Sequence, residues 1–224
     1  MEPDLRQTLR FLGIRGEPDQ ALADELNTQK QRLTRAVTPR YLFRVFPVSV
    51  TGEGPELVGA GLIFPGTLAR EMLSDCSRAA LLLCTLGAGF DAMLRAEQAR
   101  SMARAVMLDA LGSAYVEAGC DAAEEELRSR FPDLFLTDRF SPGYGDLPLS
   151  LQRGICAVLE GEKRLGVTVN DSLLMNPAKT VSAVIGLGRA LQPARIRGCA
   201  HCALRENCTY REGGTTCVSG SSEK

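Results

Sequence analysis

One short segment in the C-terminal half of the chain carries residue types that could bind a ligand with a carboxylate. It reads RFSPGY, from Arg139 to Tyr144. An arginine can clamp a carboxylate through two parallel N–H bonds, which a lysine cannot do with the same geometry. Ser141, Pro142 and Gly143 form a turn where a ligand can approach the backbone closely. The Tyr144 ring adds a flat face for stacking or for contact with a cation. The spacing alone also fits a surface turn with an exposed arginine.

A glutamate on the preceding predicted helix could bind a positive group. Glu117 follows Ala114 by three residues and Ala110 by seven, so it projects from the same face of small residues. An acid on such a face needs a partner, and a ligand ammonium or hydroxyl would serve. An ion pair with Arg139 or another arginine is the alternative.

A second segment, from Asp171 to Gly188, gives the first one a family context. It contains a serine, a Met-x-Pro and a Val-Ser pair, namely Ser172, Met175, Pro177, Val181 and Ser182. In this order the two segments resemble the signatures of the activation domain of cobalamin-dependent methionine synthase. That family binds S-adenosylmethionine through an Arg-x-x-x-Gly-Tyr loop. The resemblance covers about residues 40 to 190 and is strongest from Ala110 onward.

The resemblance implies that S-adenosylmethionine is the ligand and that Arg139 and Glu117 lie against it. It assigns further ligand contacts to Ser141, Pro142, Gly143, Tyr144, Ser172, Met175 and Ser182. In the second segment, Met175, Pro177 and Ser182 could instead only shape the loop and strand beneath the ligand.

Two positions depart from the family pattern. Gly145 stands where many members have proline, and Ile185 stands where an aromatic residue often occurs. The first change alters the stiffness of the loop, and the second removes a possible ligand contact.

The resemblance further implies reductive methylation of cob(II)alamin, with a methyl group from S-adenosylmethionine and an electron from a flavodoxin or ferredoxin. A corrinoid loop of the Asp-x-His-x-x-Gly type is absent, because the only histidine is His201 in CAHC. The cobalamin would therefore come from a partner, and the chain would be a free-standing reactivation factor for cobalamin-dependent methionine synthase. Two alternatives remain: it reactivates another corrinoid methyltransferase, or it is a non-catalytic module that binds S-adenosylmethionine or docks a redox partner.

The cysteines fall into two groups. Cys76, Cys84, Cys120 and Cys156 are scattered through apolar segments and are predicted to be small core residues. The other four, Cys199, Cys202, Cys208 and Cys217, crowd together near the C-terminus. In a reducing compartment they are predicted to bind zinc or an iron–sulfur cluster, the alternative being a mobile tail of reduced thiols.

Composition excludes several classes of partner. The 26 basic and 27 acidic residues among 224 leave a net charge of −1, which gives no electrostatic reason to expect nucleic acid or an anionic membrane. The longest apolar run, from Ala79 to Phe90, is too short to span a bilayer. The charged N-terminus lacks the apolar core of a signal peptide, so we expect a cytoplasmic protein.

The periodicity predicts a mixture of helices and strands, and the resemblance to the activation domain implies an α+β fold with a twisted, mainly antiparallel sheet flanked by helices. Residues 1–40 are predicted to be a helical extension, 41–192 the ligand-binding domain and 193–224 a cysteine-rich tail. Strands are expected at 41–50, 56–64, 80–87, 167–169 and 180–188. Helices are expected at 67–77 and 150–164, and over 90–130 as one helix or as two joined near Ser101.

Overall fold

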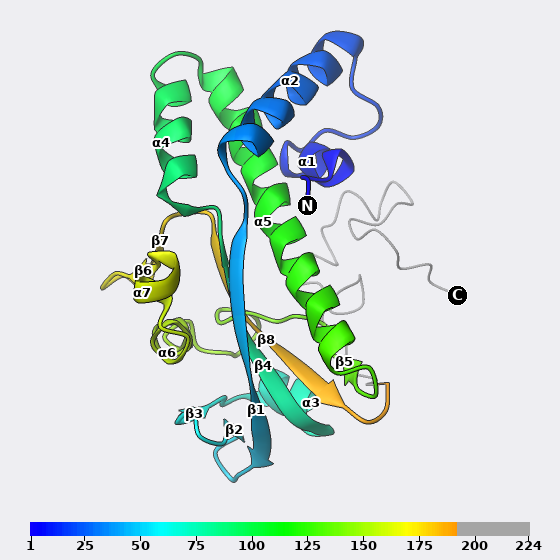
Figure 1. The fold of residues 1–224 in the computed structure, drawn as a ribbon, viewed down its shortest axis with the longest axis vertical. Coiled ribbons are helices and arrows are strands. Elements are labelled where there is room, and N and C mark those ends of the chain that lie inside the picture. Colours follow the sequence, from blue (N-terminus) through cyan, green and yellow to red (C-terminus); the bar gives the residue numbers. More distant parts are fainter. Residues whose placement is uncertain (192–224) are drawn as a thin grey trace.

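The computed structural model describes residues 1–191, and its centre is a six-stranded antiparallel sheet with helices on both faces (Figure 1). The strand order is β3-β2-β1-β4-β8-β5. The long strands are β1 (Arg40–Val50), β4 (Cys76–Thr85) and β8 (Thr180–Gly188), and the short ones are β2 (Pro55–Leu57), β3 (Leu62–Ile63) and β5 (Phe135–Leu136). The predicted α+β class with an antiparallel sheet is confirmed.

The central strand β4 contributes to two separate cores. Leu81 and Leu83 point to one face of the sheet, whereas Leu82 and Cys84 point to the other. Successive side chains of a strand alternate between faces, and β4 has apolar residues at both sets of positions. The strand expected over 80–87 is therefore present as part of β4, and its continuous apolar run is buried on both faces of the sheet.

One face of the sheet is covered by four helices. They are α1 (Leu5–Phe11), α2 (Gln20–Ala36), α4 (Gly87–Gln98) and α5 (Met102–Arg130). The tract over 90–130 is thus two helices, and α5 begins where the Ser101 side chain accepts a hydrogen bond from the Arg104 amide at 3.4 Å. Leu26 and Leu33 of α2 join the core beneath α5, so the N-terminal helices share that core. The predicted domain boundaries stay a prediction, and residues 193–224 lie outside the described part of the chain.

The opposite face is covered by shorter elements. They are α3 (Thr67–Leu73), α6 (Leu151–Val158), α7 (Gly161–Leu165) and the hairpin of β6 (Thr168–Val169) and β7 (Met175–Asn176). Phe140 and Ile155 are fully buried in the core on this side.

Two predicted elements are each divided in the structure. The single strand expected over 56–64 is the hairpin of β2 and β3, because Gly59 (φ 84°) and Gly61 (φ 64°) reverse the chain. The single helix expected over 150–164 breaks at Glu160, whose φ of 54° is left-handed, and continues as α7. β1 stays paired with β4 through Pro47, although proline has no backbone N–H to donate to the sheet.

Within residues 1–191, every helix is too short or too polar to cross a membrane.

Candidate functional site

Helix α5 carries a row of polar side chains along one side. Asp109, Ser113, Glu117 and Asp121 follow one another at four-residue intervals, and this spacing places them above one another on a helix. Glu124 continues the row one turn further. We call these five residues the α5 polar row.

Arg139 reaches the C-terminal half of this row from the segment that follows β5. This segment runs beside β8, where Phe140 and Val184 exchange two backbone hydrogen bonds of 3.1 and 2.8 Å. Phe140 is buried on the α6 side, so its neighbour Arg139 points to the α5 side. The Arg139 Nη2 atom lies 2.6 Å from a Glu117 carboxylate oxygen and 3.2 Å from one of Asp121. The Nη1 atom donates to Glu124.

Burial and charge act in opposite directions on this arginine. The Arg139 side chain is only 5% exposed, and burial alone would lower the pKa of its guanidinium. The neighbouring Cys120, Glu124, Glu117 and Asp121 more than offset this and raise the pKa above its ordinary value. Arg139 is therefore charged at neutral pH despite its burial.

The cluster around Arg139 is negative as a whole. Three carboxylates surround one guanidinium, which leaves two negative charges. Arg128 also contacts Glu124 at 3.3 Å, and it contacts Glu125 as well. The larger group of four acids and two arginines therefore also has an excess of two negative charges. The Glu117 and Asp121 side chains are 32% and 65% exposed, whereas Arg139 lies beneath them. A ligand that approaches from solvent thus meets carboxylates first, and these attract a cationic group.

The predicted ion pair between Glu117 and Arg139 is present in the structure. Sequence reasoning kept it as the alternative to direct ligand contacts by both residues. The two readings are compatible, because a ligand ammonium could bind Glu117 while Arg139 holds that carboxylate in place. The assignment of Arg139 as a carboxylate anchor stays a prediction.

The loop after Arg139 is a defined turn that presents Tyr144 to solvent. The Gly143 amide donates to the Leu147 carbonyl at 2.9 Å, and the Tyr144 amide donates to the Ser141 carbonyl at 3.1 Å. Gly143 has a φ of 93°, a conformation that favours glycine. Tyr144 is 55% exposed, so its ring is available to a ligand. Pro142 is buried beneath the turn.

The far end of the same loop is tied to α3. The Asp146 carboxylate accepts hydrogen bonds from the Thr67 amide at 2.5 Å and from the Leu68 amide at 3.1 Å. These bonds hold the pKa of Asp146 below its ordinary value. Gly66 makes the approach possible, because a Cβ atom there would lie 2.7 Å from the carboxyl carbon.

The second predicted segment is not gathered around Arg139 as a whole. Ser172 is exposed at the tip of the β6–β7 hairpin, and Met175 packs against the core on the α6 side. Ser182 is buried on β8 and shares the face of Val184, which also belongs to the α6 side. The sheet therefore separates Ser182 from Arg139.

Lys179, which the sequence reasoning missed, links the second segment to the α5 polar row. Its Nζ atom lies 2.8 Å from Ser113 Oγ and 2.9 Å from Asp109 Oδ1, and its side chain is 18% exposed. Both signature segments thus send one cation to the same side of α5. The signal was present in the sequence, because Lys179 is the only basic residue between Asp171 and Gly188.

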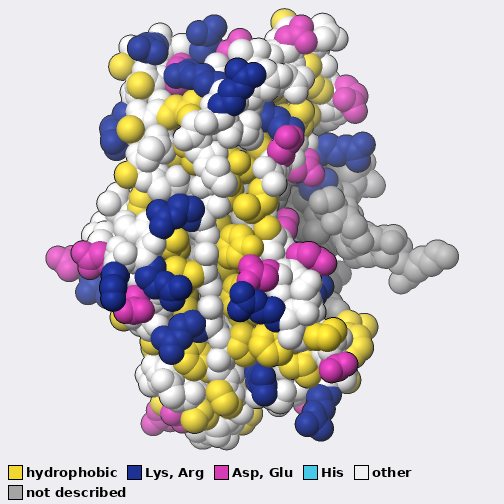
Figure 2. Space-filling model, viewed as in Figure 1, with side chains coloured by type: hydrophobic (Ala, Val, Ile, Leu, Met, Phe, Trp, Pro, Cys, Tyr) yellow, Lys and Arg dark blue, Asp and Glu magenta, His cyan; other side chains and the backbone are white. Residues whose placement is uncertain are grey.

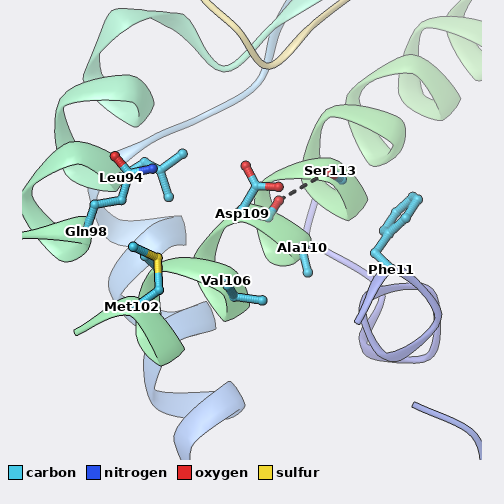
Figure 3. Close-up of a pocket in the computed structure, with 9 residues that line it drawn as sticks. Phe11, Leu94, Gln98, Met102, Val106, Asp109, Ala110 and Ser113 are labelled. Carbon is cyan, nitrogen blue, oxygen red and sulfur yellow. Dashed lines mark hydrogen bonds between the residues drawn. The ribbon is translucent and has the colours of Figure 1, made fainter. Parts of the chain in front are cut away.

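A groove continues from the N-terminal end of the polar row. It lies between α1, α4 and α5 and has a volume of about 340 Å³. Figure 3 shows Phe11 of α1 facing Val106 and Ala110 of α5, with Asp109 and Ser113 beside them. Polar and apolar surface thus meet along one helix.

The described cysteines and acids form no metal centre. Within residues 1–191, no three His, Cys, Asp or Glu side chains are grouped so that they could hold a metal ion. Cys76, Cys84, Cys120 and Cys156 are buried free thiols, as predicted. Burial raises the pKa of both Cys76 and Cys156 to about 11. The proposed metal ligands Cys199, Cys202, Cys208 and Cys217 lie outside the described residues.

A comparison with solved structures finds the same architecture in the MetH reactivation domain bound to AdoHcy. The alignment covers 95% of this chain and 83% of that chain, with a TM-score of 0.68. The two chains share one fold. Their sequences are only 17% identical, so the likeness establishes the fold and leaves the ligand open. No protein-family model and no curated protein matches the sequence.

Proposed function

We propose that the protein binds S-adenosylmethionine and acts as a free-standing reactivation factor for a separate cobalamin-dependent methionine synthase. The observation that carries the proposal is the fold shared with the MetH reactivation domain, which binds AdoHcy, the product that S-adenosylmethionine leaves after giving up its methyl group. Arg139 of the first signature segment and Lys179 of the second both reach the α5 polar row, which supports a ligand site on this side of the sheet.

The charge of the site suits this ligand. S-adenosylmethionine carries a sulfonium, an ammonium and a carboxylate, so it has one net positive charge, whereas AdoHcy has none. Glu117 and Asp121 offer exposed carboxylates to the positive groups. We assign the ligand carboxylate to the Arg139 guanidinium, and the adenosine or the sulfonium to the exposed Tyr144 ring.

The reaction requires the protein to position the reactants and does not require acid–base catalysis. Cob(II)alamin on the partner takes one electron from a flavodoxin or ferredoxin and becomes cob(I)alamin. This nucleophile attacks the sulfonium methyl group, giving methylcobalamin, while the C–S bond electrons stay on AdoHcy. No proton is transferred, so no general base is needed. The protein holds the methyl group in line with the incoming cobalt.

Calorimetry with S-adenosylmethionine tests the binding step. Arg139→Lys keeps a cation against Glu117 and Glu124 but loses the two-pronged geometry, so affinity should fall roughly 10- to 100-fold. Arg32→Lys is the matched control, because Arg32 also pairs with a buried acid, Glu97, on another part of the molecule. No binding by the wild type, or equal affinity of the Arg139 variant, would rule out the assignment.

A reactivation assay tests the function. The protein is mixed with S-adenosylmethionine, a one-electron donor and a methionine synthase in the cob(II)alamin state that lacks its own reactivation domain. Visible absorbance should show faster formation of methylcobalamin with the protein than without it. Equal rates would remove the reactivation role. If the ligand still binds, the non-catalytic module becomes the better reading, and other corrinoid methyltransferases are the next partners to try.

A further inference from the structure

A cavity of about 750 Å³ lies on the α6 side of the sheet, between α6, α7 and β6. Its floor is apolar and is formed by Cys156, Ala157, Val167 and Val169. Burial raises the pKa of the Cys156 thiol to about 11, so this group is uncharged at neutral pH and adds to the apolar floor. Helices α6 and α7 lie across the sheet from α5 (Figure 1). The sheet therefore separates this cavity from Arg139 and the α5 polar row.

The rim of the cavity carries charges of both signs. Arg153 and Lys163 supply two cations, and Glu160 and Glu162 supply two carboxylates. Figure 2 shows basic and acidic side chains next to each other at the left of the molecule, where α6 and α7 lie. The Arg153 guanidinium is oriented by the Asn170 carbonyl at 2.7 Å and by Asp171 at 3.2 Å.

Glu160 occupies a backbone position that favours glycine. It follows Leu159, the C-cap residue of α6, and its φ of 54° and ψ of 42° are left-handed. Helices commonly end with glycine at this position, because a Cβ atom makes the conformation costly. The ion pair with Lys163 does not explain the glutamate, since the charges are 3.7 Å apart and the side chains are 53% and 82% exposed. A strained residue that lines a cavity points to a role in binding.

We propose that this cavity binds a free α-amino acid with an apolar side chain. The ligand ammonium lies against the Glu160 carboxylate, which is 53% exposed at the rim. The ligand carboxylate lies against Arg153 and Lys163, and the side chain covers the accessible part of the floor at Ala157 and Val169. The site is independent of the proposed function, because it uses none of the residues assigned to S-adenosylmethionine.

Binding of L-leucine and L-methionine to the full-length protein, followed by ligand-observed NMR and calorimetry, tests the site. Both amino acids should bind, whereas L-aspartate, isoamylamine and isocaproate should not, because each lacks the apolar side chain or one of the two charges. Glu160→Gln keeps the backbone strain and the size but removes the charge, so binding should weaken at least about tenfold. Glu160→Gly removes the charge and the strain together, so binding should be lost while Tm rises by about 2–4 °C.

Three results would overturn the proposal. The first is a wild-type protein that binds none of the zwitterions. The second is an unchanged affinity in Glu160→Gln, which would show that the carboxylate takes no part. The third is loss of S-adenosylmethionine binding in the same variant, which would make the cavity part of the other site. Failure of the reactivation assay leaves these results unaffected.

Discussion

The buried guanidinium of Arg139 gives the sharpest test of the site. In Arg139→Met the side chain keeps most of its volume but loses its charge, so the carboxylates of Glu117, Asp121 and Glu124 lose their common partner. Breaking a buried ion pair by removing one partner costs about 3–5 kcal/mol, because the other charge is left in a poorly solvated place. That cost falls mainly on Glu124, which is 7% exposed, because Glu117 and Asp121 can be rehydrated.

The contact between Arg128 and Glu124 moves the expected loss toward the lower end of that range. At 3.3 Å this second arginine still offers partial compensation, so we expect a loss of about 3 kcal/mol in the free energy of unfolding. For a chain of this length that corresponds to a fall in Tm of about 6–12 °C.

Urea denaturation at pH 7, followed by circular dichroism, measures the loss. Arg128→Met is the matched control: this arginine contacts the same Glu124 but is 52% exposed, so its removal should cost at most about 1 kcal/mol. Adding Glu124→Gln to Arg139→Met removes the stranded charge and should recover at least half of the loss. A loss below about 1 kcal/mol in Arg139→Met, or no recovery in the double variant, would refute the view that one buried cation holds this cluster together.

Three further predictions concern other parts of the chain. Backbone donors at the start of α3 keep the pKa of the Asp146 carboxyl low in the folded protein. Its stabilising effect is therefore present above the pKa of the unfolded carboxyl, about 4, and is lost as the pH falls through the lower folded value. Asp146→Asn should flatten the acid side of a profile of stability against pH. Gly112→Ala places a Cβ atom 2.2 Å from the Phe90 ring, and thermal unfolding should show a loss of roughly 1–3 kcal/mol. Elemental analysis of anaerobically purified protein should find near-stoichiometric zinc or iron. Replacing Cys199 and Cys202 by serine should abolish this metal content. A metal-free wild-type protein would leave only the interpretation of a tail of reduced thiols.

The sequence predicted those helices and strands whose own residues determine whether the segment is helical or extended. β4 and β8 are long apolar runs, and α5 consists of strong helix formers after a serine cap, so periodicity and capping sufficed. The strand expected over 167–169 is present as β6, whereas the two-residue strands β5 and β7 have no such signal, because their pairing depends on neighbours brought close by the rest of the fold. The break at Glu160 was missed because glutamate is ordinarily a good helix former.

The site was predictable only in part, because its contacts also depend on segments that the fold brings together. Arg139 and Glu117 were singled out from the sequence, and the structure pairs them. Asp121 and Glu124 were not, because acids on a long helix ordinarily face solvent. Their spacing of four and seven residues from Glu117 could have indicated a shared partner, but only the path of the chain after β5 shows that this partner is Arg139.

The alternation of β4 between two cores limits how this strand can change in length. Deleting or inserting one residue within the strand would move every following side chain to the other face, so that Leu81 and Leu83 would exchange places with Leu82 and Cys84. Both cores would then be mispacked at once, and no local adjustment could restore them. We therefore expect insertions and deletions to be tolerated in the connecting turns, and substitutions that keep size and polarity to be tolerated within the strand. A shared sheet in two chains that are only 17% identical agrees with this expectation.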